Sequence, residues 1–247
     1  MNIVISNTKH ELGQKAARLG SQFINEVIDR HGNANIVVAT GASQLEMLSE
    51  LVKAQIDWSS VTGFHLDEYI DLPADHPASF RKYLRERFVE KVKPGRFYYI
   101  DGEQDTGAEC RRLGAIISDH PIDVAFVGIG ENGHLAFNDP PGDFSTREPF
   151  ICVDLDEACR RQQLNEGWFN SLSEVPRQAI SMSINQIMSA RHIICTVPDE
   201  RKSEAVSNTL NGQVTPQVPA SILQNHPSTY FFLDQESASG LSRNQAK

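Results

Sequence analysis

Short runs of apolar residues alternate along the chain with segments in which apolar residues recur every three or four positions. Residues 35–39 (NIVVA) form a compact, mostly β-branched run that ends abruptly at residues 40–43 (TGAS). Beyond this break, Leu45, Leu48 and Leu51 recur at helical spacing. A short apolar run is typical of a buried strand, and the three-to-four spacing is typical of an amphipathic helix. This stretch is therefore predicted to be a strand, a tight loop and a helix.

The same arrangement recurs from one end of the chain to the other. Strands are predicted at residues 3–5, 61–66, 97–100, 123–127, 150–153, 193–197 and 230–233. Helices are predicted at about residues 12–27, 79–89, 106–119, 156–167, 184–190 and 200–210. Strands that alternate with helices predict an α/β fold with a mostly parallel central sheet covered on both faces. No repeat, low-complexity tract or linker divides the sequence, so residues 1–247 are interpreted as a single domain.

Three polar segments, residues 40–43, 67–68 and 128–139, directly follow predicted strands. In parallel sheets, ligands bind just beyond the carboxyl ends of the strands. The three segments are therefore expected at one edge of the sheet, where they would form one site.

The composition limits the classes of partner. The chain has 247 residues, with 23 basic and 32 acidic side chains and a formal net charge of −9. This balance argues against a nucleic-acid-binding or anionic-membrane surface, because long-range repulsion would oppose both. A small anionic substrate is still compatible with it, provided that a few local donors surround the ligand.

The first residues lack the basic and apolar regions of a signal peptide, and no apolar run approaches the ~20 residues that span a bilayer. Cys110, Cys152, Cys159 and Cys195 are scattered, without a C-x-x-C pair. They are interpreted as buried apolar thiols rather than metal ligands or a disulfide framework. A cytoplasmic location is expected.

The segment Thr40-Gly41-Ala42-Ser43 combines small residues and hydroxyls at the start of a predicted helix. Unpaired N–H groups at a helix start bind phosphate, so a phosphate loop is one interpretation. A plain turn with Ser43 as N-cap is the other. No lysine follows in the pattern of a nucleoside-triphosphate-binding loop, which argues against that class of enzyme.

The acidic pair Asp67-Glu68 follows an apolar strand. A carboxylate at a strand end can serve as a general base. An ordinary acidic loop that caps the next helix explains these two residues equally well, and without other evidence it is the simpler interpretation.

The glycines Gly128, Gly130 and Gly133 fit G-x-G-x-x-G after a strand, and Asp154 lies about 20 residues further on, as in dinucleotide-binding sites. In those sites the third glycine opens a substantial helix. Here residues 140–141 are both proline, which interrupts such a helix, so the pattern argues against a nucleotide.

His134 offers a better interpretation of this loop, because imidazole is suited to proton transfer near neutral pH. Asn132 precedes it, and Asp139, five residues later, could fix the tautomer of the ring. A structural histidine hydrogen-bonded within the turn is the alternative. Among basic residues, Arg160, Arg161 and Lys202 are candidates for an anion site, although exposed surface charge explains each of them.

Three motifs together resemble the glucosamine-6-phosphate deaminase family: TGAS at residues 40–43, FHLDEYIDLPADHPASF at 64–80 and GIGENGHLAFNDP at 128–140. Their order and spacing match, and the similarity extends from about residue 36 to 234. The resemblance implies a three-layer αβα Rossmann-like fold, shared with 6-phosphogluconolactonases. It also implies conversion of glucosamine 6-phosphate and water to fructose 6-phosphate and ammonia, with no metal or nucleotide cofactor.

The resemblance assigns roles to individual residues. Asp67 matches the acid/base that moves a proton between C2 and C1, and His134 matches the residue that assists ring opening. The expected catalytic residues are Asp67, His134, Asp139 and Asn132. The expected substrate- or phosphate-binding residues are Thr40, Gly41, Ala42, Ser43, Glu68, Gly133, Lys202 and Arg161.

The sequence departs from the family pattern at several positions. Asn132 stands where the family has Asp or Asn, and Asp139 stands where Glu is usual. Gly167 aligns with an arginine that binds phosphate or an effector in well-studied deaminases, so Arg160 or Arg161 is a candidate substitute. The chain is also shorter at its C-terminus than the allosteric hexameric deaminases.

Several alternatives stay open. Galactosamine 6-phosphate is a second candidate substrate, and a homo-oligomer is neither required nor excluded. A lactonase would resemble the chain in the phosphate and Gly-His loops, but lactonases typically have Ser-Leu-Phe-Pro-Gly where this chain has residues 136–140 (AFNDP). A non-catalytic sugar-phosphate sensor would bind the ligand without turnover.

Overall fold

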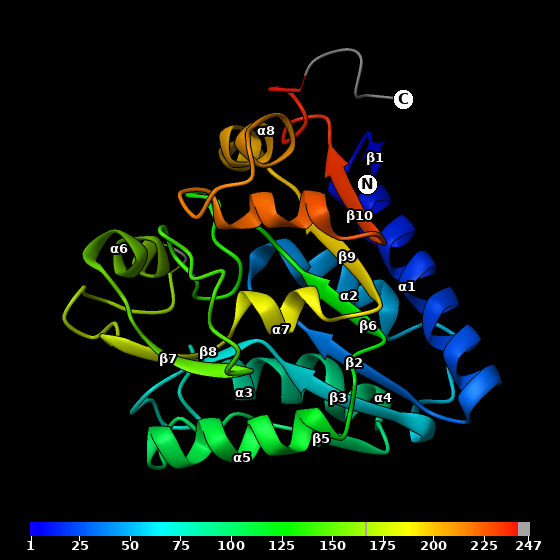
Figure 1. Ribbon diagram of the computed structural model, residues 1–247, viewed down its shortest axis with the longest axis horizontal. Helices are drawn as coiled ribbons and strands as arrows, with labels where there is room; N and C mark the ends of the chain where they lie inside the picture. Colours follow the sequence, from blue (N-terminus) through cyan, green and yellow to red (C-terminus); the bar gives the residue numbers. More distant parts are fainter. Residues whose placement is uncertain (166, 242–247) are drawn as a thin grey trace.

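Seven parallel strands form the central sheet of the computed structural model, which describes residues 1–165 and 167–241 (Figure 1). Every strand pair in this sheet is parallel. In spatial order the strands are β1 (Asn2–Ser6), β10 (Thr229–Asp234), β9 (His192–Val197), β6 (Val124–Val127), β2 (Ala34–Val38), β3 (Val61–His65) and β5 (Arg96–Tyr98).

Helices cover both faces of this sheet because its central strands are apolar on both sides. Ile36 and Val38 contribute to one buried cluster, and Val37 and Ala39 contribute to the other. The first face carries α1 (Lys9–His31), α2 (Leu45–Leu51), α3 (Phe80–Leu84), a π-helical turn (Arg85–Val89) and α4 (Glu90–Val92). The second face carries α5 (Thr106–Ser118), α7 (Ile184–Met188), α8 (Ser203–Asn211) and a 3₁₀ segment (Pro219–Asn225). The predicted three-layer αβα fold with a parallel central sheet is confirmed.

A second, three-stranded antiparallel sheet was not predicted. It consists of β4 (Asp67–Tyr69), β8 (Gln178–Met182) and β7 (Phe150–Asp154). The interpretation of residues 67–68 as a loop was therefore wrong, and the predicted strand at 150–153 belongs to this sheet instead of the parallel one. β8 escaped prediction because four of its five residues are buried, so the sequence QAISM has no two-residue alternation of apolar and polar positions.

The small sheet carries α6 (Glu157–Asn165), which lies at the left of Figure 1 beside β7 and β8. The predicted helix at 156–167 ends earlier than expected, and it included residue 166, which lies outside the described residues. A buried cluster that includes Tyr69, Phe137, Cys159 and Phe169 joins α6 to β4 and to the loop after β6.

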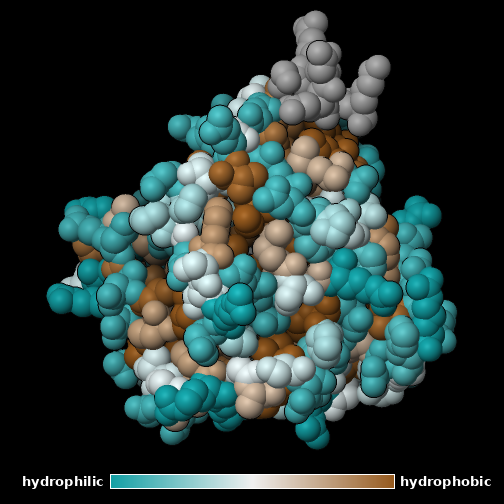
Figure 2. All heavy atoms as spheres, in the orientation of Figure 1, coloured by the Kyte–Doolittle hydropathy of each residue, from teal (hydrophilic) through white to brown (hydrophobic). Residues whose placement is uncertain are grey.

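The face shown in Figure 2 is mostly hydrophilic, and hydrophobic residues show mainly in hollows between polar side chains. Large exposed hydrophobic side chains in the described residues are Met1, Leu45 and Trp168. None of the described helices is both long and apolar enough to cross a bilayer. The single-domain interpretation of residues 1–247 stays a prediction.

Candidate active site

The site lies where the direction of strand addition reverses in the central sheet. From β2 the chain adds β3 and β5 on one side, and it returns to place β6 on the other side of β2. The loops that follow β2 and β6 run apart, which leaves a crevice at the carboxyl ends of these two neighbouring strands. A cavity of about 350 Å³ occupies this position. It is lined by the segments that follow four adjacent strands, β9, β6, β2 and β3.

One end of the cavity is formed by Thr40, Gly41, Ala42 and Ser43, as predicted for a phosphate loop. Gly41 has a φ of +95°, a conformation that favours glycine. The next residue, Gln44, is buried and fastens the loop to the sheet. Its Nε2 donates to the carbonyl of Val127 (3.2 Å), and its Oε1 accepts from the hydroxyl of Thr196 (3.0 Å). These two hydrogen bonds hold the loop against β6 and β9.

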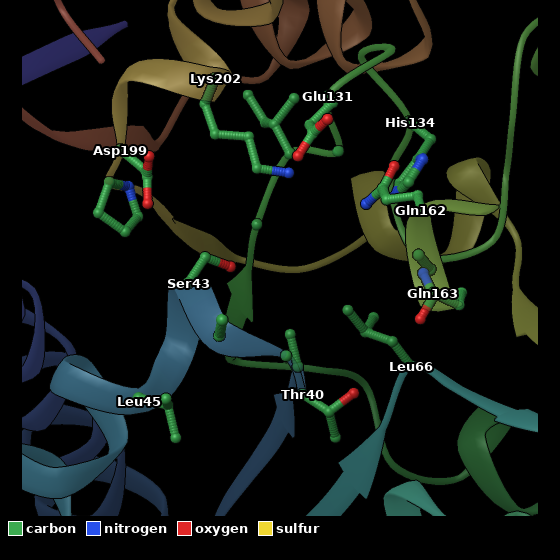
Figure 3. A pocket seen from close by; sticks show the side chains of 18 of the residues that line it. Thr40, Ser43, Leu45, Leu66, Glu131, His134, Gln162, Gln163, Asp199 and Lys202 are labelled. Atoms are coloured by element: carbon green, nitrogen blue, oxygen red, sulfur yellow. The ribbon is translucent and has the colours of Figure 1, made fainter. Parts of the chain in front are cut away.

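Lys202 lines the same end of the cavity from a 3₁₀ turn (Glu200–Lys202) that follows β9. Figure 3 shows its side chain directed into the cavity near Ser43. Two further cations, Lys9 and Arg201, also line the cavity and were not predicted. Each followed a predicted strand, which is the signal that could have found them.

Asp199 holds these two cations at the cavity. Its carboxylate lies 2.9 Å from Lys9 Nζ and 3.5 Å from Arg201, and Arg201 also lies 3.5 Å from Glu131. The hydrogen bond from Lys9, acting against a smaller effect of burial, lowers the pKa of Asp199 and raises that of Lys9. Lys9 and Arg201 are therefore each paired with a carboxylate that also lines the cavity, which offsets their charge.

His134 lines the cavity and is held by the two side chains that were predicted to support it. Its Nδ1 lies 3.0 Å from Asp139 Oδ1, and Asn132 Nδ2 donates to the same oxygen at 2.7 Å. Asn132 Oδ1 in turn accepts the backbone N–H of His134 (3.1 Å). The shorter carboxylate of Asp139 therefore reaches the ring. Asp139 and Asn132 lie behind His134 and do not themselves line the cavity.

The surroundings of Asp139 favour its charged form. Burial by itself raises the pKa of this carboxyl group. Hydrogen bonding and charge from His134, with smaller contributions from Asn132 and the Cys159 thiol, outweigh burial and lower the pKa below its usual value. A charged Asp139 accepts a hydrogen bond from His134 Nδ1–H, which fixes the tautomer of the imidazole.

The backbone at Gly130 makes room for the imidazole. A Cβ atom at this position would lie 2.2 Å from His134 Cε1, which is far inside van der Waals contact. Gly130 also donates its backbone N–H to the carbonyl of His134 (3.0 Å). The second glycine of the G-x-G-x-x-G pattern is therefore explained by packing against the histidine.

The small sheet joins the histidine loop to Asp67. Ser181 on β8 accepts the backbone N–H of Phe137 (3.1 Å) and is the register partner of Asp67 on β4. Asn138 donates to the carbonyls of Leu135 (2.7 Å) and Met182 (2.9 Å). Asp67 is 8% exposed and lines the cavity that His134 also lines. Ser181 and Asn138 were not predicted, because the bonds that join the two segments, Phe137 to Ser181 and Asn138 to Met182, each connect positions 44 residues apart.

Three of the predicted binding residues do not line the cavity. Glu68 points away from Asp67 and is fully buried. Its carboxylate accepts the hydroxyl of Ser79 (3.0 Å) and the backbone N–H groups of Phe80 (3.2 Å) and Arg81 (2.7 Å), so it holds the start of α3. Burial raises the pKa of Glu68, although these donors oppose the rise. Glu68 lies outside the lining because adjacent residues of a strand face opposite sides of the sheet.

Gly133 and Arg161 are the other two predicted residues that lie outside the cavity lining. Gly133 has a φ of +84°, and its carbonyl accepts the N–H of Ala220 (2.8 Å), so it shapes the turn. Arg161 is exposed on α6 and pairs with Glu157 one turn earlier. Its neighbour Arg160 donates to backbone carbonyls at Leu172 and Val175 and also lies outside the cavity lining.

α6 instead contributes Gln162 and Gln163 to the cavity. Figure 3 shows these two side chains toward the part of the cavity that holds His134, away from Ser43 and Lys202. Sequence analysis missed both, because polar residues on an amphipathic helix are usually solvated.

The dinucleotide interpretation of the glycine loop does not fit the structure. Residues 134–149 form no helix after Gly133, so the helix start that such a site needs is missing from this loop. In the described part of the chain, no group of three or more His, Cys, Asp or Glu side chains could hold a metal ion. The expectation that all cysteines are buried was wrong for Cys152, which is exposed, and for Cys110, which is half-buried.

Comparison with known proteins decides the family. The family described as glucosamine-6-phosphate isomerases/6-phosphogluconolactonase matches residues 7–231. The chain belongs to this family. Within it, the chain is 37% identical over 242 residues to a glucosamine-6-phosphate deaminase of Lactobacillus delbrueckii subsp. bulgaricus, covering 97% of this chain and 99% of that one. It is 35% identical to a glucosamine-6-phosphate deaminase of Bacillus cereus, covering 97% and 88%.

Solved structures of this isomerase/lactonase family share the fold. A structure described as a monomeric glucosamine-6-phosphate deaminase superimposes with a TM-score of 0.89 at 31% identity, covering 97% of this chain and all of that one. A 6-phosphogluconolactonase from Shewanella baltica superimposes with a TM-score of 0.78 at 20% identity, covering 95% and 97%. The second likeness shows the common fold alone.

Proposed function

We propose that this family member is a glucosamine-6-phosphate deaminase, which converts glucosamine 6-phosphate and water to fructose 6-phosphate and ammonia. The observation that carries the proposal is that Asp67 and His134 line the same cavity as the phosphate loop and Lys202. An acid/base pair and an anion site in one cavity match a phosphorylated sugar that exchanges protons. The near full-length likeness to named deaminases supports the same activity.

The end of the cavity formed by residues 40–43 and Lys202 would hold the substrate phosphate. Thr40 and Ser43 supply hydroxyl donors, and Lys202 supplies a positive charge. Charge-assisted hydrogen bonds of this kind are stronger than neutral ones. They would fix C6, so that C1 and C2 reach the opposite part of the cavity.

His134 would assist ring opening. Asp139 Oδ1 accepts from Nδ1, so Nε2 is the ring nitrogen that exchanges a proton with the sugar. Opening the pyranose requires a proton to leave the C1 hydroxyl and another to reach the ring oxygen. A tautomer held by a carboxylate keeps the ring ready for both transfers.

Asp67 would carry out the isomerisation. Its carboxylate takes the proton from C2 and returns it to C1, while a nitrogen-bound proton passes to the C1 oxygen. The products of this step are a C1 hydroxymethyl group and a C2 iminium. Water then adds at C2 and ammonia leaves, which gives the ketose. The ammonium group on C2 acidifies that carbon, so the step needs no further electron sink.

The test is incubation of the protein with glucosamine 6-phosphate, followed by measurement of both ammonia and fructose 6-phosphate. Equal amounts of the two products are expected. Hydrolysis of 6-phosphogluconolactone without ammonia release would replace the proposal with the lactonase activity, and tight binding without turnover would replace it with a sensor. A parallel assay with galactosamine 6-phosphate measures which configuration at C4 the protein prefers in its substrate. The cytoplasmic location and the oligomeric state stay predictions.

A further inference from the structure

Gln163 is a buried polar side chain of the cavity to which the reaction assigns no role. It lies on α6 with 6% of its surface exposed, and it lines the cavity. Within the described part of the chain, the side-chain hydrogen bond of Gln163 is made by its Oε1 and not by its Nε2. An amide donor on the wall of a cavity, carried by a side chain that is otherwise buried, is placed to donate to a ligand in that cavity.

The orientation of this amide is set by Tyr69. The Tyr69 hydroxyl donates to Gln163 Oε1 at 2.8 Å, which leaves Nε2 as the end of the amide available to the cavity. Tyr69 is itself 1% exposed, and its ring packs against Phe80, Phe137 and Phe169 at centroid distances of 5.0, 5.3 and 5.7 Å. A ring confined in this way holds its hydroxyl, and therefore the amide of Gln163, in a fixed position.

The chemistry of the cavity indicates which group Gln163 binds. Cations and hydroxyls gather near Ser43 and Lys202, whereas Gln163 lies toward His134 (Figure 3). A neutral amide N–H is a suitable donor to a hydroxyl oxygen, and it has no charge to contribute to a phosphate. The group it meets is therefore a sugar hydroxyl close to the reacting carbons, and C3 and then C4 follow C2 along the chain.

We propose that Gln163 is a substrate-binding residue whose Nε2 donates to the C3 or C4 hydroxyl of the sugar, with Tyr69 as its positioning residue. This inference rests on the proposed function, because it takes an amino-sugar phosphate as the ligand. Sites that hydrogen-bond a substrate hydroxyl reject analogues that lack it, since the buried donor is then unpaired. Gln163 thereby contributes to the choice of substrate.

Two substitutions separate this role from a purely structural one. Gln163→Glu keeps an acceptor for Tyr69 but replaces the N–H donor with oxygen, and Gln163→Leu removes both. If the donor binds substrate, both variants raise KM for glucosamine 6-phosphate by about tenfold, with a smaller change in kcat. A KM for Gln163→Glu within about twofold of the wild type would show that only the bond to Tyr69 matters, and it would overturn the proposal.

Two further variants test the positioning role of Tyr69 and supply a matched control. Tyr69→Phe removes only the hydroxyl, so it is expected to raise KM by about threefold. The value of kcat, which depends on Asp67 and His134, is expected to stay the same. Gln104→Leu makes the same change as Gln163→Leu at an exposed position outside the cavity, and its KM is expected to equal that of the wild type. A KM for Tyr69→Phe equal to that of the wild type would contradict the positioning role.

Binding without turnover keeps this proposal separate from the proposed function. Calorimetry with 2-amino-2-deoxyglucitol 6-phosphate, an unreactive open-chain analogue, is compared with inorganic phosphate. Gln163→Leu is expected to weaken binding of the analogue by about tenfold and to leave the affinity for inorganic phosphate unchanged. Equal weakening of both would overturn the hydroxyl contact. Absence of ammonia from the wild type would instead count against the deaminase, while the binding comparison still decides the role of Gln163.

Discussion

His134 Nδ1 lies 3.0 Å from Asp139 Oδ1, and the same carboxylate oxygen accepts the side-chain amide of Asn132. Two donors that converge on one oxygen leave the carboxylate little freedom to rotate. The imidazole is therefore held in one tautomer and one orientation, and both follow from a five-residue separation on a single loop.

Replacement of Asp139 tests this arrangement. In Asp139→Asn the amide can present its N–H to the ring and favour the other tautomer, so kcat is expected to fall by about a hundredfold with little change in KM. Asp139→Glu retains the carboxylate and is expected to keep kcat within about tenfold of the wild type. Steady-state kinetics of ammonia release measure both. Equal kcat values for Asp139→Asn and the wild type would remove Asp139 from the mechanism.

The depressed pKa of Asp139 predicts how stability depends on pH. A carboxyl group whose pKa is lower when folded stabilises the protein above its ordinary value of 3.8, and this contribution is lost as the pH falls through the folded pKa. Asp139→Asn lacks the contribution. The difference in free energy of unfolding between the two proteins is therefore expected to narrow as the pH falls below about 4 and through the folded pKa of Asp139. Urea titrations across this range measure it, and a constant difference would contradict the assignment.

Asp67→Asn tests the proposed proton transfer at carbon. The amide has nearly the same shape but cannot accept the C2 proton, so kcat is expected to fall by about a thousandfold. Affinity for the open-chain analogue is expected to stay within about threefold, because the phosphate contacts are unchanged. Turnover and calorimetry on the same preparation check both values. Full activity would exclude Asp67 as the acid/base.

Gly130→Ala tests the close approach of the backbone to the histidine ring. The added Cβ would lie 2.2 Å from His134 Cε1, so the ring must move and kcat is expected to fall by about a hundredfold. Gly114→Ala is a matched control on α5, where the nearest atom to the new Cβ is 3.6 Å away. The control is expected to keep full activity. If both variants were equally active, the ring position would not depend on Gly130.

Lys202→Ala and Arg161→Ala compare two residues that the sequence predicts to bind an anion, of which only Lys202 lines the cavity. Loss of the cavity lysine is expected to raise KM by about tenfold or more, because a charge-assisted contact to phosphate is removed. Arg161 pairs with Glu157 on the exposed side of α6, so its loss is expected to leave KM unchanged. Competition by inorganic phosphate provides a second measurement. A raised KM for Arg161→Ala would return that residue to the site.

The sequence by itself determined the layered α/β fold and the position of most of the site. Strand and helix periods are local properties, so the alternation of short apolar runs with helical spacing predicted the order of strands and helices. Because the strands of the central sheet are parallel, the loops at their carboxyl ends lie at one edge of the sheet. Strand ends and family motifs predicted Thr40–Ser43, Asp67, His134 and Lys202 as site residues, and the structure places all of them around one cavity. The support of His134 by Asp139 was also found, because both residues belong to one loop.

Only the tertiary structure decided which neighbours of these residues face the cavity. Asp67 and Glu68 are adjacent in sequence, yet the pleat of β4 sends one side chain to the cavity and the other to the start of α3. On α6, helical rotation places Gln163 inside and Arg161 outside. The pairing of Tyr69 with Gln163 spans 94 positions of the chain, and no local pattern encodes such a contact. The sequence determines the chemistry of each residue, whereas the direction of its side chain depends on the packing of elements that are far apart along the chain.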